Sequence, residues 1–206
     1  YMIQHLFPIP VYAVKFRDLN EKEDSVFKDI IAKTEDDKKK YLDEQKEYAK
    51  HYGEIVLDNL QGKNFQSRDN FIFDTYEDLS ELKKFISVHI RQFGKQVWSI
   101  NAKQDTPITQ SWINVNKKGE NHHLHSHPNS FISGVFYYHC NKNDSITFKN
   151  PNIAGHSIAP KSNEKAASYL AANTDFKVTT GVLILFPSWL EHNVKSNLYE
   201  TPRISL

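Results

Sequence analysis

Histidine is the residue type in this chain whose number and spacing most clearly suggest chemistry. The sequence holds 10 histidines, and half of them lie between positions 122 and 139. In an extended segment, side chains two positions apart share a face. His123, His125 and His127 are therefore expected to project the same way, and an adjacent pair could hold one metal ion. Neutral imidazole binds iron, zinc, copper or nickel. The alternative is a histidine-rich loop or an adventitious metal binder.

A second group of residues, far downstream, makes a metal site more plausible. His192 ends a mostly apolar segment that begins at Phe186, and it could supply a third ligand. Arg203 follows eleven residues later, where its planar guanidinium could bind a carboxylate in bidentate fashion. Taken singly, His192 could instead cap a strand end and Arg203 could be a surface charge. Their combination with the earlier pair, His125 and His127, favours a shared cavity.

The first half of the chain is expected to supply a strand and two helices. Residues 3–16 are predicted to be extended, and the prolines at positions 8 and 10 suit an edge strand. Asn20 is a suitable N-cap for a charged helix over residues 21–52. Its apolar residues are few, which indicates a helix on the surface. They are Val26, Phe27, Ile30, Ile31 and Tyr41.

A second helix is predicted over residues 76–98, after a polar loop at 61–70. Its apolar residues recur at steps of three and four, which predicts one buried stripe. From about residue 106 the pattern changes to short apolar segments separated by turn residues, as in a sandwich, barrel or jelly roll. The predicted strands cover residues 108–115, 131–138, 145–148, 176–179 and 181–186. Residues 1–105 are thus expected to support a core of residues 106–206, in one structural unit.

Composition narrows the classes of protein to consider. The 26 basic and 25 acidic residues nearly balance, so charge gives no argument for a nucleic-acid partner. Cys140 is the one cysteine, which excludes an intrachain disulfide. No window approaches the length of a membrane span and no signal peptide is recognised. We therefore expect a cytoplasmic protein with no membrane partner, and a homodimer stays open.

The C-terminal half resembles a family of 2-oxoglutarate/iron(II) oxygenases from cyanophages and marine bacteria, related to prolyl hydroxylases. The resemblance covers about residues 110–206, and the helical half is similar only loosely. Its motifs are Ser111-Trp112-Ile113-Asn114, His125-x-His127-Pro128-Asn129-Ser130, Ser133-Gly134-Val135-Phe136-Tyr137-Tyr138, Phe186-Pro187-Ser188, His192 and Arg203-x-Ser205. The resemblance implies an α+β, mainly β fold, a double-stranded β-helix (jelly roll) with an N-terminal helical extension. The cytoplasm would be that of the host if the protein is phage-encoded.

The resemblance also implies roles for particular residues. His125, His127 and His192 would bind Fe(II), and Arg203 with Ser205 would bind the far carboxylate of 2-oxoglutarate. The wider superfamily has a carboxylate where this chain has His127, so either three histidines bind iron or only two do. Two further cosubstrate contacts are implied. Asn114, which shares a face with Trp112, and Tyr137 are both candidates, although each could instead be a structural residue. His122, His139 and His156 are interpreted as structural or exposed.

The implied activity is a dioxygenase that hydroxylates a substrate while 2-oxoglutarate is oxidised to succinate and carbon dioxide. Prolyl residues of proteins are the first candidate substrate, and a small molecule is the alternative. Two other readings stay open. One is a three-histidine oxygenase that needs no 2-oxoglutarate, against which Arg203 argues. The other is a metal-binding or sugar-binding jelly roll without catalysis.

Overall fold

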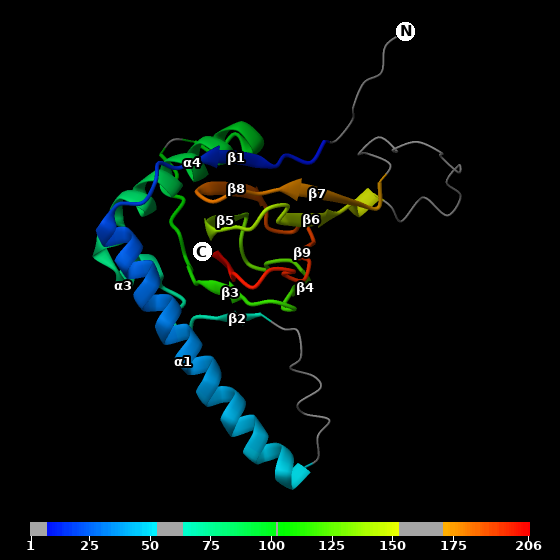
Figure 1. Cartoon of the computed structure of the whole chain (residues 1–206). Coiled ribbons are helices and arrows are strands. Elements are labelled where there is room, and N and C mark those ends of the chain that lie inside the picture. Colours follow the sequence, from blue (N-terminus) through cyan, green and yellow to red (C-terminus); the bar gives the residue numbers. More distant parts are fainter. Residues whose placement is uncertain (1–7, 53–63, 102, 153–170) are drawn as a thin grey trace.

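Two antiparallel sheets and a group of helices make up the computed structural model (Figure 1), which describes residues 8–52, 64–101, 103–152 and 171–206. The larger sheet has the strand order β1-β8-β5-β10-β3-β2, and the smaller one has the order β4-β9-β6-β7. The strands of the larger sheet are β1 (Tyr12–Lys15), β2 (Phe65–Gln66), β3 (Asn114–Asn116), β5 (Ile132–His139), β8 (Val182–Pro187) and β10 (Arg203–Ser205). Those of the smaller sheet are β4 (His122–His125), β6 (Ser145–Lys149), β7 (Asn173–Lys177) and β9 (His192–Val194).

The first helix, α1 (Glu21–Tyr52), begins where its cap residue predicts. Asn20 accepts hydrogen bonds at Oδ1 from the backbone N–H groups two and three residues later, both at 3.0 Å. Glu23 returns the contact, because its Oε2 accepts the Asn20 N–H at 2.9 Å. This reciprocal pair is a capping box. Arg17 holds the buried Glu23 carboxylate with two nitrogens, at 2.7 and 2.8 Å, and the predicted cap is confirmed.

The second helix differs from its prediction only in the first turn. Its main part is α4 (Ser80–Trp98), and the preceding turn is the 3-10 helix η1 (Glu77–Leu79), which follows α3 (Ile72–Thr75). No side chain caps η1, and a tighter first turn is a common solution at an uncapped helix start. The predicted stripe is buried at Leu82, Ile86 and Phe93.

Side chains of β5 and β8 alternate between two cores, and this alternation places the site. One face packs with α1 and α4 in a cluster that includes Phe136, Leu183 and Leu185. The opposite face packs with β6 of the smaller sheet through Tyr137, Ile184 and Phe186. Period-two alternation in strands produces this division. Residues of odd number in β5 therefore face the space between the two sheets.

Several predicted strand bounds need correction. The strand predicted over residues 108–115 is only β3 (Asn114–Asn116), and Trp112 lies before it, because the neighbouring strands β10 and β2 pair only with residues 114–116. The strand predicted at 176–179 is β7 (Asn173–Lys177). The polar loop at 61–70 contains β2. Of the predicted first strand, residues 3–7 lie outside the described part, and β1 is an edge strand as expected.

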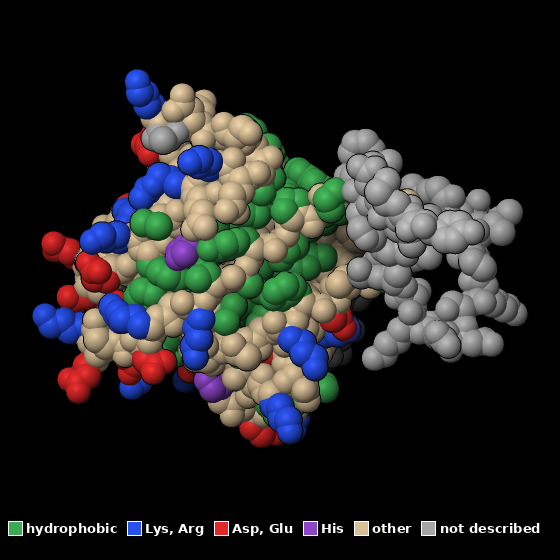
Figure 2. Space-filling view, turned by 90° about the horizontal axis from the view of Figure 1, so that it is seen from above, with side chains coloured by type: hydrophobic (Ala, Val, Ile, Leu, Met, Phe, Trp, Pro, Cys, Tyr) green, Lys and Arg blue, Asp and Glu red, His purple; other side chains and the backbone are tan. Residues whose placement is uncertain are grey.

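The face that contains β1 and α4 is seen from above in Figure 2. A broad area of hydrophobic side chains crosses it, with charged side chains along its border. β1 contributes the half-buried Tyr12 and Val14, while Ala13 and Lys15 point outward. None of the helices in the described part of the chain has the length and apolar character needed to span a bilayer.

Phe27 is the contact through which α1 holds the larger sheet. Its side chain is fully buried and stacks on Tyr138 of β5, with ring centroids 4.5 Å apart. Phe27→Ala should lower the free energy of unfolding by about 3–5 kcal/mol, as for other buried phenylalanines. Phe131→Ala is the matched control, because that ring is 80% exposed and its loss should change stability by less than about 0.5 kcal/mol. Urea denaturation measures both, and equal effects would contradict this account.

Candidate functional site

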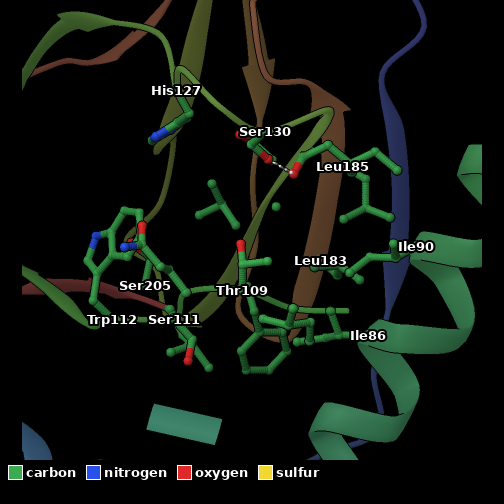
Figure 3. Close-up of a pocket in the computed structure, with 18 of the residues that line it drawn as sticks. Ile86, Ile90, Thr109, Ser111, Trp112, His127, Ser130, Leu183, Leu185 and Ser205 are labelled. Atoms are coloured by element: carbon green, nitrogen blue, oxygen red, sulfur yellow. Dashed lines mark hydrogen bonds between the residues drawn. The ribbon is translucent and has the colours of Figure 1, made fainter. Parts of the chain in front are cut away.

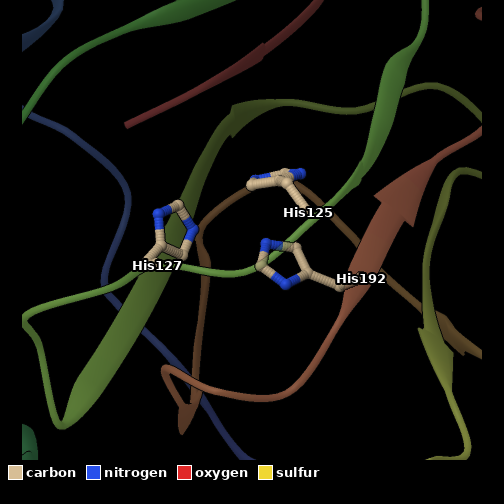
Figure 4. A group of neighbouring side chains, drawn as sticks. All are labelled: His125, His127 and His192. Carbon is tan, nitrogen blue, oxygen red and sulfur yellow. The ribbon is translucent and has the colours of Figure 1, made fainter.

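Three histidine rings converge between the two sheets. The ligand-capable nitrogens of His125, His127 and His192 all lie within 4.8 Å of one another. Figure 4 shows the three rings turned toward a common centre. The ring centroids of His125 and His192 are 4.3 Å apart, and that of His127 lies 4.9 and 5.2 Å from them. Such spacing is suited to holding one metal ion by imidazole nitrogens.

Antiparallel pairing of β4 with β9 creates this arrangement. His125 and His192 are register partners in that pair. His127 follows the end of β4, and its backbone N–H donates to the Ser188 carbonyl at 3.0 Å. This hydrogen bond ties the segment after β4 to the β8–β9 connection and holds the third ring beside the first two.

Backbone carbonyls fix the ring tautomers of two of the histidines. The Nδ1 atom of His125 lies 2.8 Å from the His123 carbonyl oxygen, and that of His192 lies 2.9 Å from the Leu190 carbonyl oxygen. A carbonyl oxygen only accepts, so each Nδ1 carries the proton and each Nε2 keeps its lone pair. Metal-binding histidines are usually oriented by this kind of contact.

Burial keeps these rings neutral near pH 7. It lowers the pKa of His192 to about 4, and it also lowers the pKa values of His125 and His127. Removing an imidazolium from water is costly, and the neighbouring rings add to that cost if they are charged. Neutral imidazole is the form that binds a metal ion.

The expectation that His123, His125 and His127 share a face was wrong for His123. The ladder between β4 and β9 has a register shift between His122 and His125, and an irregularity of this kind interrupts the alternation of side chains. His123 is exposed, whereas His122 lines the cavity and stacks on His125 at a centroid distance of 4.2 Å. The interpretation of His122 as structural or exposed stays a prediction, while His156 lies outside the described residues.

The same cavity, of about 850 Å³, is lined by Arg203 and Ser205 of β10. Arg203 is 3% exposed. Its Nη1 donates to Asp144 Oδ1 at 3.1 Å and its Nη2 donates to the Lys195 carbonyl at 2.9 Å. In Figure 3, Ser205 and Trp112 lie at the end of the cavity near His127, and Ile86 and Leu183 line the other end. A fixed cation and the three imidazoles thus share one space.

Four buried polar atoms of residues that line this cavity have no hydrogen-bond partner within the described part of the chain: Thr106 Oγ1, Trp112 Nε1, Asn116 Nδ2 and Tyr137 Oη. Asn114 also lines the cavity, and its Oδ1 accepts from Asn64 at 2.9 Å. Burial raises the pKa of Tyr137 far above its usual range, so the phenol keeps its proton. Buried donors without partners are costly, and together with Arg203 they suit an anionic ligand with several acceptor oxygens.

Some of these residues were not identified from the sequence. Asn116 lies two positions after Asn114 in β3, so the two side chains share a face. The predicted strand ended at residue 115, and extending it by one residue would have included Asn116. His122 required knowledge of the irregular ladder. Asp144 lies in a turn, 59 positions before Arg203, and no local pattern connects the two.

The comparison with protein-family models gives one match, over residues 110–206, to the family described as "Putative 2OG-Fe(II) oxygenase". The matched residues contain all three converging histidines together with Arg203 and Ser205. A comparison with curated protein sequences finds no match.

Solved structures with a similar course of the chain have low sequence identity. An oxidoreductase of the 2OG-Fe(II) oxygenase family from Burkholderia pseudomallei is 13% identical, with 75% of each chain covered and a TM-score of 0.48. A prolyl-4-hydroxylase from Pseudomonas putida is 12% identical, with 69% of this chain and 65% of that chain covered and a TM-score of 0.45.

A third structure covers more of the chain. The non-heme alpha ketoglutarate dependent carbocyclase SnoK from nogalamycin biosynthesis is 10% identical, with 96% of this chain and 77% of that chain covered. The TM-score of 0.53 shows that the two chains share an overall fold.

Proposed function

We propose that the chain, whose residues 110–206 match the family of 2OG-Fe(II) oxygenases, hydroxylates an organic substrate with Fe(II) and 2-oxoglutarate. The two antiparallel sheets are proposed to form the double-stranded β-helix, or jelly roll, expected from the sequence. Helices within residues 1–105 support that core through the cluster around Phe27 and Phe136. A prolyl side chain in a protein is the first substrate to test.

The observation that carries the proposal is the convergence of His125, His127 and His192 within 4.8 Å. All three are proposed to bind the iron. The Nε2 lone pairs of His125 and His192 are free, since both Nδ1 atoms contact carbonyl oxygens. Imidazole suits iron, so the donor set fits the metal that the family requires.

Arg203, Ser205, Asn114 and Tyr137 are proposed to hold 2-oxoglutarate. The fit rests on chemistry seen in the cavity: a buried guanidinium and buried donors without partners, which a dicarboxylate would satisfy. Asn116 joins this set, because its buried Nδ2 has no partner in the structure. A carboxylate bound by several donors replaces the hydration that these groups lack.

When bound, the metal and 2-oxoglutarate supply the oxidising chemistry that the protein itself lacks. The chain's own residues would orient the metal and 2-oxoglutarate and shield them from water. Neutral imidazoles present lone pairs, Arg203 neutralises the far carboxylate, and Tyr137 donates a hydrogen bond without losing its proton. Phe148 and Phe186 pack on His192, at centroid distances of 6.2 and 4.7 Å, and exclude water from one side of the ring.

Oxygen-dependent conversion of 2-oxoglutarate to succinate is the test of this proposal. The purified chain with Fe(II) and 2-oxoglutarate should form succinate in air and none under nitrogen. A product carrying one added oxygen atom, found by mass spectrometry with proline-containing peptides, would identify the prolyl substrate. Absence of succinate in the presence of bound iron would reject the proposal.

The third histidine favours one alternative, a three-histidine oxygenase that does not use 2-oxoglutarate. Three imidazoles leave the metal one charge unit more positive than two imidazoles and a carboxylate would. Oxygen consumption that is independent of 2-oxoglutarate would support this alternative. The buried Arg203, which would then have no anionic ligand to bind, favours the 2-oxoglutarate-dependent reading.

His127→Ala should weaken Fe(II) binding roughly ten- to hundredfold. A four-ligand metal site is worth about 10–16 kcal/mol, so one ligand's share is a few kcal/mol, and each 1.4 kcal/mol is about a factor of ten. The expected loss is at the low end because His127 lies beyond β4 and is the least constrained of the three. Competition with a coloured chelator measures the affinity.

His123→Ala is the matched control for His127→Ala. It removes an exposed imidazole from the same segment and should leave the affinity unchanged. Equal affinities for His127→Ala and the wild type would show that only two histidines bind the metal.

A further inference from the structure

Two anchors fix the guanidinium of Arg203 in the wall of the cavity. One is the Asp144 carboxylate at 3.1 Å from Nη1, and the other is the Lys195 carbonyl at 2.9 Å from Nη2. The Arg203 and Asp144 side chains are 4% and 7% exposed. Anchors on both terminal nitrogens set the plane of the group, because a guanidinium is rigid and its donors lie in one fork. Arg203 is thus held even without a ligand.

Asp144 is itself held by the turn that carries it. Its Oδ2 accepts the Asn141 N–H at 2.8 Å, and its own N–H donates to the Asn141 carbonyl at 3.2 Å. The Val178 N–H donates to the Asp144 carbonyl at 3.1 Å, which ties the turn to the end of β7. Because these contacts hold Oδ2 and the backbone of Asp144, the carboxylate is fixed with Oδ1 directed at Arg203.

We propose that Asp144 is a positioning residue that fixes Arg203 so that the cavity selects 2-oxo acids with a second carboxylate. This inference rests on the proposed function, because it assigns a selectivity to the same cosubstrate site. The 2-oxo-carboxylate end of such an acid is common to many metabolites. The far end of the molecule distinguishes a dicarboxylate from an analogue that ends in a methyl group. Among the described residues that line the cavity, Arg203 is the cation that can bind a carboxylate there.

Asp144 could position Arg203 or could only compensate its charge, and these two roles predict opposite effects of Asp144→Asn on the affinity for the dicarboxylate. Asp144→Asn leaves the cavity one unit more positive, and charge alone would then strengthen the binding of a dianion. Loss of the Asp144 contact would weaken the binding of the dianion, because a guanidinium that is free to move loses orientational freedom when it binds the carboxylate. A fall in affinity for the dicarboxylate is therefore the mark of a positioning role.

The experiment compares 2-oxoglutarate with 2-oxopentanoate, which has a methyl group in place of the far carboxylate. Each acid is titrated anaerobically into the full chain loaded with Fe(II), and the visible charge-transfer band of the chelate reports binding without turnover. Wild-type protein should bind 2-oxoglutarate at least about tenfold tighter than 2-oxopentanoate, since a charge-assisted contact is worth about 1.5–3 kcal/mol. Asp144→Asn should reduce this ratio roughly tenfold, with 2-oxopentanoate binding unchanged.

Asp74→Asn is the matched control. Asp74 is also an ion-paired carboxylate, bound to Lys83 at 2.7 Å, but its side chain is 61% exposed and neither residue contacts Arg203. This variant should keep the wild-type ratio. If Asp144→Asn bound 2-oxoglutarate as tightly as the wild type, or more tightly, Asp144 would be only a counterion and the inference would be overturned. If wild-type protein bound neither acid, the proposed function would fail and this inference with it.

A double-variant cycle keeps the test decisive if Asp144→Asn folds poorly. Arg203→Met alone leaves the Asp144 carboxylate without its partner, whereas the pair Arg203→Met with Asp144→Asn removes both partners of the buried pair, which is usually better tolerated. Because Asp144 acts through Arg203, the double variant should bind 2-oxoglutarate no more weakly than Arg203→Met. A further loss of 2-oxoglutarate affinity in the double variant would contradict the proposed route.

Discussion

His192→Ala is expected to weaken Fe(II) binding so far that 2-oxoglutarate turnover is lost with it. His192 is the most buried of the three rings, at 3% exposed, and its Nδ1 contact with the Leu190 carbonyl directs Nε2 at the site. Its removal should weaken Fe(II) binding roughly a hundredfold or more, by the share of one well-oriented ligand. The visible band of the 2-oxoglutarate chelate should disappear as well, since that band requires the metal.

His123→Ala is again the control for this loss, because it removes an exposed imidazole from the same strand pair. It should retain iron and activity, and circular dichroism should show that both variants are folded. Retention of stoichiometric Fe(II) by His192→Ala at micromolar concentrations would exclude His192 as a ligand. A metal held by other histidines would then have to be located.

Arg203→Ala is expected to raise the 2-oxoglutarate requirement steeply while metal binding stays nearly intact. Truncating one partner of a buried charge pair typically costs about 2–5 kcal/mol, or roughly 30- to 5000-fold in affinity. The KM for 2-oxoglutarate should therefore rise by a factor in this range. The Fe(II) affinity, measured by chelator competition, should change little, because Arg203 contacts Asp144 and Lys195 rather than a histidine.

Removal of Arg203 alone leaves Asp144 buried without its partner, which can destabilise a protein by about 3–5 kcal/mol. Arg203→Ala combined with Asp144→Asn avoids that cost and should show the same KM. Arg203→Lys keeps the charge but not the planar fork, so it should fall between the wild type and Arg203→Ala. Normal turnover by Arg203→Ala at ordinary 2-oxoglutarate concentrations would remove the cosubstrate assignment and make the three-histidine alternative the leading one.

The helices were predictable because their signals are local. Asn20 and Glu23 lie three positions apart and form the cap of α1, and the apolar stripe of α4 repeats within one segment. Strand bounds were less predictable, since a strand ends where its neighbour ends. The sequence predicts that Trp112 is part of a strand, but β10 and β2 pair only with residues 114–116. The predicted strand over residues 108–115 was therefore too long, although Trp112 and Asn114 both line the cavity.

The candidate site shows the same division between local and distant information. His125 and His127 were recognisable as a pair because two positions separate them. The exposure of His123 depends on a register shift that two distant strands, β4 and β9, impose on each other. Asp144 could not have been identified, because its contact with Arg203 depends on how the β5–β6 turn meets β10.

Pairing of β1 with β8 has a consequence for how the protein is made. Lys15 has Val182 as its register partner, about 170 residues later in the chain. A ribosome adds about 5–20 residues per second, so β1 waits roughly 10–35 seconds for its partner to be synthesised. During that time Tyr12 and Val14 have no sheet to cover them, although α1 can already form because its cap and backbone hydrogen bonds are local. Contacts of such long sequence separation slow folding, and the nascent N-terminal strand is where we expect a chaperone to bind first.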